Sequence, residues 1–403
     1  MQRLSTFESL RYRNFRLFWF GQFMSLIGSW MQTVGQGWLV LELTNSSFLL
    51  GLVSAIGSLP VLFLSIFAGV VADKVRKRNL IIVTQTSLTI LAFSIGIITY
   101  MGIVKFWHIL VIVALFGVAN AFDMPARQTF VVELVDKESL MNAIALNSSI
   151  FNGARIIGPA IAGVMVSSIG VAGCFILNAI SFIPVIVGLS LIDGEFRVDS
   201  SSNDSVIESL KGGFLYLKEN PNIFFIIIMV AINSVFGMPY ITLMPVFARD
   251  VFKVGAQGLG FLMSATGVGA LIGALFIASI GRYKYKGRLL ITGIIGFSIF
   301  LLLFTITRSF TVAIWMLVFT GFCMIVFTST ANTTVQTYTQ DDMRGRVMSF
   351  YTTFFTGMAP LGNLQAGYLA NLWGAPKAIF IGAVMNIVIV IVILLKLPDI
   401  KNL

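Results

Sequence analysis

Charged residues and cysteines are scarce in this sequence. Asp, Glu, Lys and Arg together make up 11% of the 403 residues, whereas hydrophobic residues make up 57%, and the mean hydropathy is +0.93. A water-soluble fold could not bury that much apolar surface, so the composition excludes a soluble globular protein. The two cysteines, Cys174 and Cys323, fall in apolar stretches and predict neither a disulfide framework nor a metal site.

Histidine is limited to His108, and carboxylates are few within the apolar stretches. An enzyme working inside the membrane would need a nucleophile, a base or metal ligands clustered at depth. Because the sequence offers no such cluster, we expect a protein that is not an enzyme and that uses no cofactor.

Long apolar runs fill most of the chain. Twelve stretches of about 20 residues are long enough to cross a bilayer, and they predict an all-α integral membrane protein with twelve transmembrane helices. The first stretch is too long for a cleavable signal peptide and lacks a small-residue cleavage site, so we expect it to remain. The stretches are 16–42, 47–72, 80–103, 106–127, 142–168, 172–192, 222–247, 257–281, 288–307, 309–335, 345–371 and 375–396.

Glycines repeat at a fixed displacement in the two parts of the chain. Gly153, Gly158, Gly163 and Gly170 recur 204 positions later as Gly357, Gly362, Gly367 and Gly374. Upstream the displacement grows to 209, which pairs Gly51 with Gly260. We therefore predict two pseudo-repeated six-helix halves, 1–192 and 222–403, joined by a cytoplasmic linker at 193–221. Duplicated halves are typical of secondary transporters.

The linker begins with a segment rich in Asp and Ser. Apolar residues then follow at helical spacing, namely Val206, Leu210, Phe214 and Leu217. This pattern predicts a short helix lying on the inner membrane surface. A helix that binds a soluble partner remains an alternative.

The net charge of +10 arises mainly from basic residues in particular loops and at the chain ends. Most of the 27 Lys and Arg residues lie in the even-numbered connections and at the two ends of the chain. The positive-inside rule then predicts that both termini are cytoplasmic, in an inner or plasma membrane, and the charge does not indicate a nucleic-acid partner. The outer loops carry only Lys105, Arg249, Lys253, Arg308 and Lys377.

Several motifs carry a family resemblance. The stretch Gly69–Arg78, with Asp73 and Lys74 at its centre, is similar to the loop signature of the major facilitator superfamily, although Arg76 stands where a Gly is usual. The stretch Gly153–Gly163 resembles the Gly-Pro motif of the antiporting exporters in that superfamily. The stretches 10–19, 25–32 and 123–128 look like the branch that contains macrolide exporters and the enterobactin exporter. The resemblance covers nearly the whole chain and implies the major facilitator fold.

The resemblance also implies roles in conformational change. In the family, the acid at Asp73 latches the outward-open state across the two halves, and it could pair with a base or with the N-terminus of a facing helix. The neighbouring bases could instead be topology anchors, and the glycines of the fifth stretch could serve packing. The gating candidates are Gly69, Asp73, Lys74, Lys77, Arg78, Arg127, Gly153, Gly158, Pro159 and Gly163.

Polar side chains form stripes on several apolar stretches. In the first stretch they step by three or four residues and share one helical face, which is unsuited to lipid. Stripes in the fourth, fifth, seventh, tenth and eleventh stretches could join it to line a central substrate cavity, or could bond neighbouring helices. The cavity candidates are Gln22, Ser25, Ser29, Gln32, Gln36, Asn120, Asn152, Arg155, Asn233, Tyr240, Asn332, Gln336, Thr356 and Asn363.

Two carboxylates are candidates for proton coupling. Antiport normally uses an acid that alternates between solvent and a buried state, and Glu42 and Asp123 lie in or beside the spans. Asp123 is favoured because Arg127 is one turn away, although the two could form a purely structural ion pair. Arg155 lies in mid-span, where a cation needs a partner such as Asp123 or an anionic substrate.

These features together predict a secondary transporter that exports amphipathic small molecules of drug, macrolide or siderophore type. We expect alternating access, protons as the coupling ion, and a monomer surrounded by membrane lipids. Uptake, facilitated diffusion and transport of a lysophospholipid remain open alternatives, and an intramembrane enzyme is a more distant one.

Overall fold

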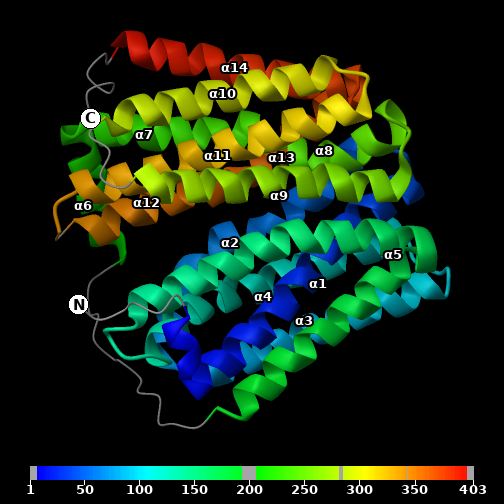
Figure 1. Cartoon of the computed structure of the whole chain (residues 1–403), viewed down its shortest axis with the longest axis horizontal. Helices are drawn as coiled ribbons and strands as arrows, with labels where there is room; N and C mark the ends of the chain where they lie inside the picture. The colour runs from blue at the N-terminus through cyan, green and yellow to red at the C-terminus, as the bar shows by residue number, and fades with distance from the viewer. Residues whose placement is uncertain (1–6, 193–205, 281–284, 342, 397–403) are drawn as a thin grey trace. The chain divides into compact units, whose positions relative to one another are not determined.

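The computed structural model describes residues 7–192, 206–280, 285–341 and 343–396, and every regular element in them is helical (Figure 1). In this part of the chain, nine helices are long and apolar enough to cross a membrane by length and composition. One of them, α5, has 51 residues and contains two of the predicted spans. The predicted all-α membrane class is therefore confirmed.

The first half follows the predicted stretches closely. Apolar runs form each helix, and the breaks between them come at residues suited to turns. For example, α1 ends at Asn45, which has a left-handed φ of 51°. The elements are η1 (Glu8–Arg11), α1 (Arg13–Thr44), α2 (Ser47–Lys74), α3 (Lys77–Tyr100), α4 (Phe106–Glu133) and α5 (Leu140–Ser190).

The second half differs from the predicted stretches in two places. The seventh stretch is interrupted by π-helical turns on either side of α8, next to Pro239, and the eleventh breaks at Met358, just before Pro360. Proline lacks the amide hydrogen that a continuous helix requires, which accounts for breaks at these positions. The elements are α6 (Val206–Glu219), α7 (Pro221–Ile232), η2 (Asn233–Gly237), α8 (Tyr240–Val246), η3 (Phe247–Val251), α9 (Gly255–Ile280), α10 (Lys286–Ile306), α11 (Phe310–Tyr338), α12 (Arg344–Gly357), α13 (Ala359–Trp373) and α14 (Ala375–Lys396).

The chain divides into two compact units, which are described separately below. Unit 1 comprises Met1–Asn45, Leu59–Ser201 and Ala256–Gly260, and unit 2 comprises Ser46–Ser58, Ser202–Gly255 and Phe261–Leu403. The first turns of α2 therefore group with unit 2, and the first turn of α9 groups with unit 1.

Each unit has its own apolar core. In unit 1, α1, α4 and α5 bury a cluster in which the rings of Phe18 and Phe130 meet edge to face, with centroids 5.5 Å apart. In unit 2, the linker helix α6 contributes Tyr216 and Leu217 to a cluster shared with α7, α10, α11, α12 and α14. These cores hold the polar side chains of neighbouring helices in fixed positions.

Equivalent glycines of the repeat have equivalent surroundings. Gly170 and Gly374 both have positive φ, 78° and 85°, and each lies where one predicted span gives way to the next. A side chain would be strained at either position. Gly158 packs against the backbone of Ile27 in unit 1, and its equivalent Gly362 packs against the backbone of Val235 in unit 2. The predicted duplication is therefore visible in the backbone.

Candidate functional site

A carboxylate is buried between α3 and α4 in unit 1. The side chain of Asp123 has no exposed surface. Its Oδ1 accepts hydrogen bonds from Thr84 Oγ1 at 2.7 Å and from Gln85 Nε2 at 3.0 Å. Arg127, one turn further along α4, places Nη2 2.5 Å from Asp123 Oδ2. The structure thus confirms the ion pair between Asp123 and Arg127 that the sequence suggested.

This set of contacts offsets the cost of burying a charge. An isolated carboxylate in an apolar interior would be strongly unfavourable, whereas a paired and hydrogen-bonded one can persist. The hydroxyl of Ser25 on α1 donates to Gln85 Oε1 at 3.4 Å. The buried network therefore connects three helices through Ser25, Gln85, Thr84, Asp123 and Arg127.

A small pocket of mixed polar and apolar lining adjoins this network. It has a volume of about 120 Å³ and receives side chains from α1, α4 and α5. Gln22 lies in it with 4% exposure, and its Oε1 has no hydrogen-bond partner among the described residues. Arg127 lines the pocket and also contacts Asp123, so one side chain links the pocket to the buried carboxylate. The lining residues are Phe18, Gln22, Leu26, Met124, Arg127, Gln128, Asn147 and Phe151.

A second polar cluster joins α1 to the second span of α5. Gln32 is 6% exposed, and its Oε1 accepts a hydrogen bond from Asn178 Nδ2 at 2.6 Å. Asn178 in turn accepts from the hydroxyl of Ser181. A Cβ at Gly28 would overlap the Asn178 and Ser181 side chains, so this glycine allows the close approach. Within the predicted first-span stripe, Gln32 is engaged with a neighbouring helix.

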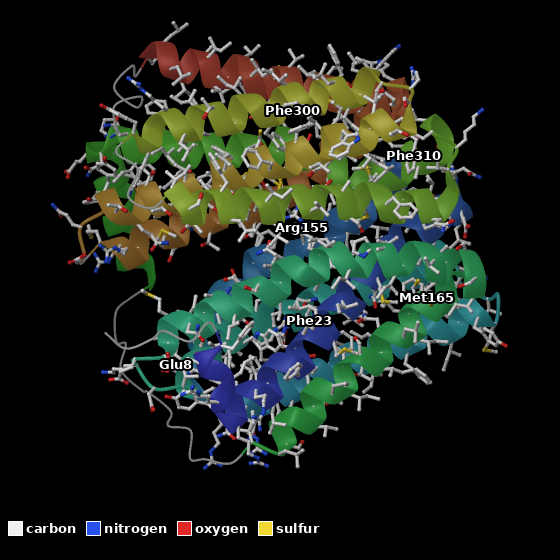
Figure 2. All side chains as sticks on the ribbon, in the orientation of Figure 1. Glu8, Phe23, Arg155, Met165, Phe300 and Phe310 are labelled. Atoms are coloured by element: carbon white, nitrogen blue, oxygen red, sulfur yellow. The ribbon has the colours of Figure 1, made fainter. Side chains whose placement is uncertain are left out.

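Arg155 lies half-buried on α5 and belongs to unit 1, as does Phe23 of α1; both residues are labelled in Figure 2. Its guanidinium carbon lies 5.9 Å from the centre of the Trp30 ring. An aromatic face stabilises a cation most where water is excluded. Trp30 is therefore one partner of the mid-span cation.

Unit 2 contains a buried amide cluster of its own. Asn386 on α14 donates from Nδ2 to Asn233 Oδ1 and to Ser298 Oγ, each at 3.1 Å. Tyr240 is fully buried, with its ring centre 6.0 Å from that of Phe297. The cluster ties α10, α14 and η2 together, and it places the predicted cavity residues Asn233 and Tyr240 inside the unit.

The remaining candidates are distributed over several helices of both units. Ser29 and Asn152 bond to backbone carbonyls one turn earlier, as do Asn120 and Thr356. Gln336 donates to Asn332, and Asn363 accepts from Thr242. Gln36 is half-buried, and Glu42 is exposed with Trp38 Nε1 2.5 Å from its carboxylate. Asp123 is therefore the better placed of the two proton-coupling candidates.

The loop signature makes contacts within unit 1. Lys77 forms an ion pair with Glu133 at the end of α4. Arg78 donates to the carbonyl oxygens of Leu189 and Ser190 at 2.6 and 2.8 Å, and these oxygens lie at the negative end of the α5 dipole. Gly69 and Lys74 lie on α2, and the side chain of Asp73 is outside the described part of the structure.

The glycines of the fifth span pack closely. A Cβ at Gly153 would lie 3.6 Å from the ring of Phe23, and one at Gly163 would lie 3.0 Å from the Ala256 carbonyl oxygen of α9. Pro159 is buried beside Gly158. Gly153 therefore allows close packing against α1, and Gly163 allows close packing against the first turn of α9.

Sequence reasoning missed the partners of the buried polar groups. Thr84 and Gln85 are adjacent polar residues in an apolar stretch, and Asn178 with Ser181 shows the one-turn spacing that marks a polar face. Asn386 is a single amide with no such pattern. Among the described residues, no group of three or more His, Cys, Asp or Glu side chains could hold a metal ion.

Comparison with known proteins places this arrangement in context. The family described as "Transmembrane secretion effector" matches residues 4–403. The staphyloferrin A transporter of Staphylococcus aureus is 29% identical over 387 residues, 94% of each chain. Macrolide efflux protein A of Streptococcus pyogenes is 23% identical over 401 residues, 95% of this chain and 96% of the relative.

Solved structures show the same fold at lower identity. The nucleoside transporter NupG superimposes with a TM-score of 0.76 at 15% identity, covering 95% of this chain and 98% of the other. A bacterial homologue of the lysosomal transporter Spinster, in an inward-facing conformation, has a TM-score of 0.72 at 16% identity, covering 97% and 96%. Both comparisons show that the chain shares the fold of these structures.

Proposed function

Since the chain belongs to the transmembrane secretion effector family of the major facilitator superfamily, we propose that it exports amphipathic small molecules by proton antiport. The family and the relatives are transporters rather than enzymes, and they handle small-molecule substrates. The relatives with efflux names favour export over uptake. The multidrug efflux pump Tap of Mycolicibacterium fortuitum, 23% identical over 385 residues, adds a second such name.

The observation that carries the proton coupling is the Asp123 network. A carboxylate that transports protons must be stable when ionised and must be reachable from water. Asp123 meets the first condition through Thr84, Gln85 and Arg127. For the second condition, access to water, Asp123 would depend on Arg127, whose side chain is 17% exposed and lines the pocket. Protonation of Asp123 would release Arg127 and change the charge of the pocket.

The pocket also suggests how substrate and proton could compete. Aromatic rings of Phe18 and Phe151 flank the orphaned Gln22 carbonyl and the Arg127 guanidinium. Such a mixture suits one polar group of an amphipathic molecule, with its apolar body against the rings. Arg127 belongs both to this pocket and to the ion pair with Asp123, so we expect substrate and proton to oppose each other at this site.

Two glycine contacts support alternating access. In unit 2, a Cβ at Gly51 of α2 would lie 2.9 Å from the Gly367 Cα of α13. In unit 1, a Cβ at Gly260 of α9 would lie 3.1 Å from the Gly163 Cα of α5. The displacements 209 and 204 make these two contacts equivalent, so each joins a helix of one sequence half to a helix of the other. We propose that both separate during transport.

The orientation follows from the loop charges. Basic residues concentrate in the even-numbered connections, so both termini should lie in the cytoplasm of a cell whose inner or plasma membrane contains the protein. Substrate would then move from the inner to the outer face.

Transport by purified protein in liposomes tests the proposal. We would load liposomes with a macrolide, a carboxylate siderophore or a cationic dye, impose a pH gradient of either sign, and follow substrate and internal pH together. Movement of substrate against its gradient, with protons moving oppositely, supports antiport. Movement of both in the same direction would indicate symport, and equilibration without proton flux would indicate facilitated diffusion.

A crosslinking pair tests the glycine contacts. Gly51→Cys with Gly367→Cys, in a cysteine-free background, should form a disulfide and arrest transport until it is reduced. As a matched control, Gly35→Cys with the native Cys174 retained joins α1 to α5 within the same half, where a Cβ at Gly35 would lie 3.2 Å from the Cys174 Cβ, and its disulfide should leave transport intact. Full transport by the oxidised Gly51 and Gly367 pair would show that this contact does not open.

A further inference from the structure

The linker helix α6 is fixed to the second half of the chain by one of its faces. Tyr216 and Leu217 are buried in the unit 2 core, at 8% and 1% exposure. The backbone N–H of Gln340 donates to the Tyr216 hydroxyl at 3.2 Å. A Cβ at Gly213 would lie 2.9 Å from the Phe350 ring, so the helix lies close against α12. α6 is therefore a docked element.

The opposite face of α6 is both apolar and basic. Phe214 and Leu215 are 55% and 58% exposed, and Lys211 and Lys218 are exposed as well. At about 100° per residue, Lys211, Leu215 and Lys218 fall within about 60° of one another on the side away from Tyr216, and Phe214 lies at the edge of this face, about 60° from Leu217. The predicted single apolar stripe is wrong in this respect, because Leu217 is buried and Phe214 is not. Val206 and Leu210 of that stripe have side chains outside the described part.

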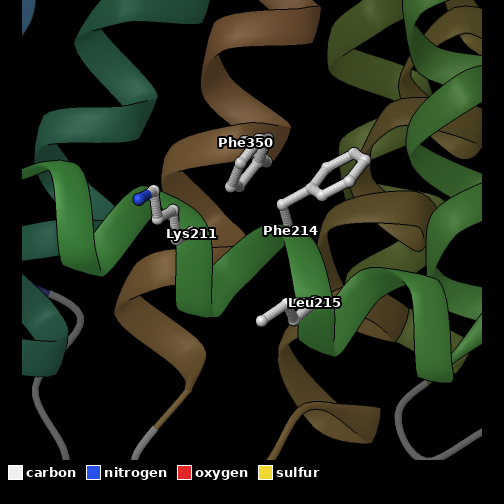
Figure 3. Close-up of a pocket in the computed structure, with 4 residues that line it drawn as sticks. All are labelled: Lys211, Phe214, Leu215 and Phe350. Carbon is white, nitrogen blue, oxygen red and sulfur yellow. The ribbon is translucent and has the colours of Figure 1, made fainter.

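This face opens onto a shallow apolar groove of about 550 Å³, shown in Figure 3. The rings of Phe214 and Phe350 lie on the same side of α6, with the Lys211 side chain beside Phe350. Leu215 lines the groove from the other side of the ribbon. Arg346 of α12 lies close to α6 as well, since a Cβ at Gly212 would lie 2.8 Å from its Nη1.

We propose that this groove binds an anionic phospholipid of the cytoplasmic leaflet. An acyl chain would lie along Phe214, Leu215 and Phe350, while the phosphate would meet Lys211 and Lys218 at the rim. A helix with aromatic and aliphatic residues beside lysines is suited to the interface of an anionic membrane. Each lysine near such a surface strengthens binding by roughly five-fold.

Among the side chains that the structure describes, neither Asp341 nor Glu219 occupies these lysines. Asp341 is engaged with Arg344, whose Nη2 is 2.5 Å from its carboxylate. Glu219 is exposed at the end of α6, beyond the groove. A lipid satisfies the apolar rings and the cations together, whereas a soluble anion would satisfy only the cations. We therefore assign a lipid rather than a free phosphate.

Quenching by brominated lipids tests this inference. Full-length protein carrying Leu215→Cys with an apolar fluorophore, in a cysteine-free background, would be reconstituted into phosphatidylcholine vesicles. The vesicle lipid would include brominated phosphatidylglycerol from the start or, in a parallel preparation, brominated phosphatidylcholine. We expect stronger quenching by the anionic lipid. Because both leaflets of the vesicles have the same composition, the result does not depend on the orientation proposed above.

Matched variants locate the effect. Lys211→Gln with Lys218→Gln should abolish the preference for the anionic lipid, whereas Lys211→Arg with Lys218→Arg should retain it. Lys377→Gln, which removes an exposed cation elsewhere, should also leave it unchanged. Equal quenching by both lipids in the parent protein, or loss of the preference in the arginine variant, would overturn the proposal.

A soluble competitor separates the two sources of phosphate. Glycerol phosphate at the concentration of the lipid should not relieve the quenching, because it cannot fill the apolar groove. Relief by glycerol phosphate would show that the site recognises a free phosphate, and the lipid assignment would fail.

Discussion

Replacing Asp123 with Asn tests the most consequential feature of unit 1. The substitution keeps an acceptor for Thr84 and Gln85 but removes the charge that lies 2.5 Å from Arg127. Removing one partner of a buried ion pair typically costs about 3–5 kcal/mol, because the other charge is left unpaired. Arg127 is partly exposed and faces the small pocket, so we expect the lower end of that range, about 3 kcal/mol. A reserve of roughly 5–15 kcal/mol would leave the protein folded.

A double-mutant cycle apportions this cost. Arg127→Gln alone leaves a fully buried carboxylate with two hydrogen bonds, so we expect it to be the more damaging single change, at about 4 kcal/mol. Asp123→Asn with Arg127→Gln removes both charges and should cost less than the sum of the single changes by about 2 kcal/mol or more. Chemical unfolding in detergent measures all four proteins on the same scale.

Transport separates the functional role from the structural one. If Asp123 couples protons, the folded fraction of Asp123→Asn should still exchange substrate across liposomes but should no longer respond to an imposed pH gradient. Transport would be normalised to folded protein, measured by size-exclusion chromatography. Gradient-driven accumulation at the parental rate per folded molecule would refute the coupling role and leave the pair as a structural one.

Three further predictions concern single positions. Lys137→Cys should be protected from an impermeant thiol reagent in intact cells while Lys377→Cys reacts, since the loop charges place them on opposite sides of the membrane; the reverse pattern would invert the topology. Gln32→Leu should lower the free energy of unfolding by about 1–3 kcal/mol, because Asn178 loses its buried acceptor, and an unchanged unfolding midpoint would remove Gln32 from the helix contact. Arg155→Lys should preserve membrane abundance but impair transport, because an ammonium cannot reproduce the planar guanidinium over Trp30; full transport per folded molecule would assign Arg155 to packing alone.

The repeat explains why so much of the backbone could be predicted. Gly170 and Gly374 require positive φ, and a duplicated chain repeats such requirements at a fixed displacement. The sequence predicts that Gly51 corresponds to Gly260 and Gly163 to Gly367. In the structure these glycines form two equivalent helix contacts, Gly51 with Gly367 and Gly260 with Gly163. Helix boundaries were less predictable, because the breaks at Met358 and around α8 depend on how nearby prolines are accommodated.

Membrane class, number of spans and the duplication were determined by the sequence itself, since hydropathy and glycine spacing are properties of the chain. The ion pair of Asp123 with Arg127 could also be predicted from the sequence, because the two residues are one helical turn apart. The partners Thr84, Gln85 and Asn178 were decided only by the tertiary structure, since they come from other helices. The same is true of α6, where docking of Tyr216 and Leu217 leaves a basic and apolar face exposed. Periodicity shows which residues share a face, but only packing decides which face is buried.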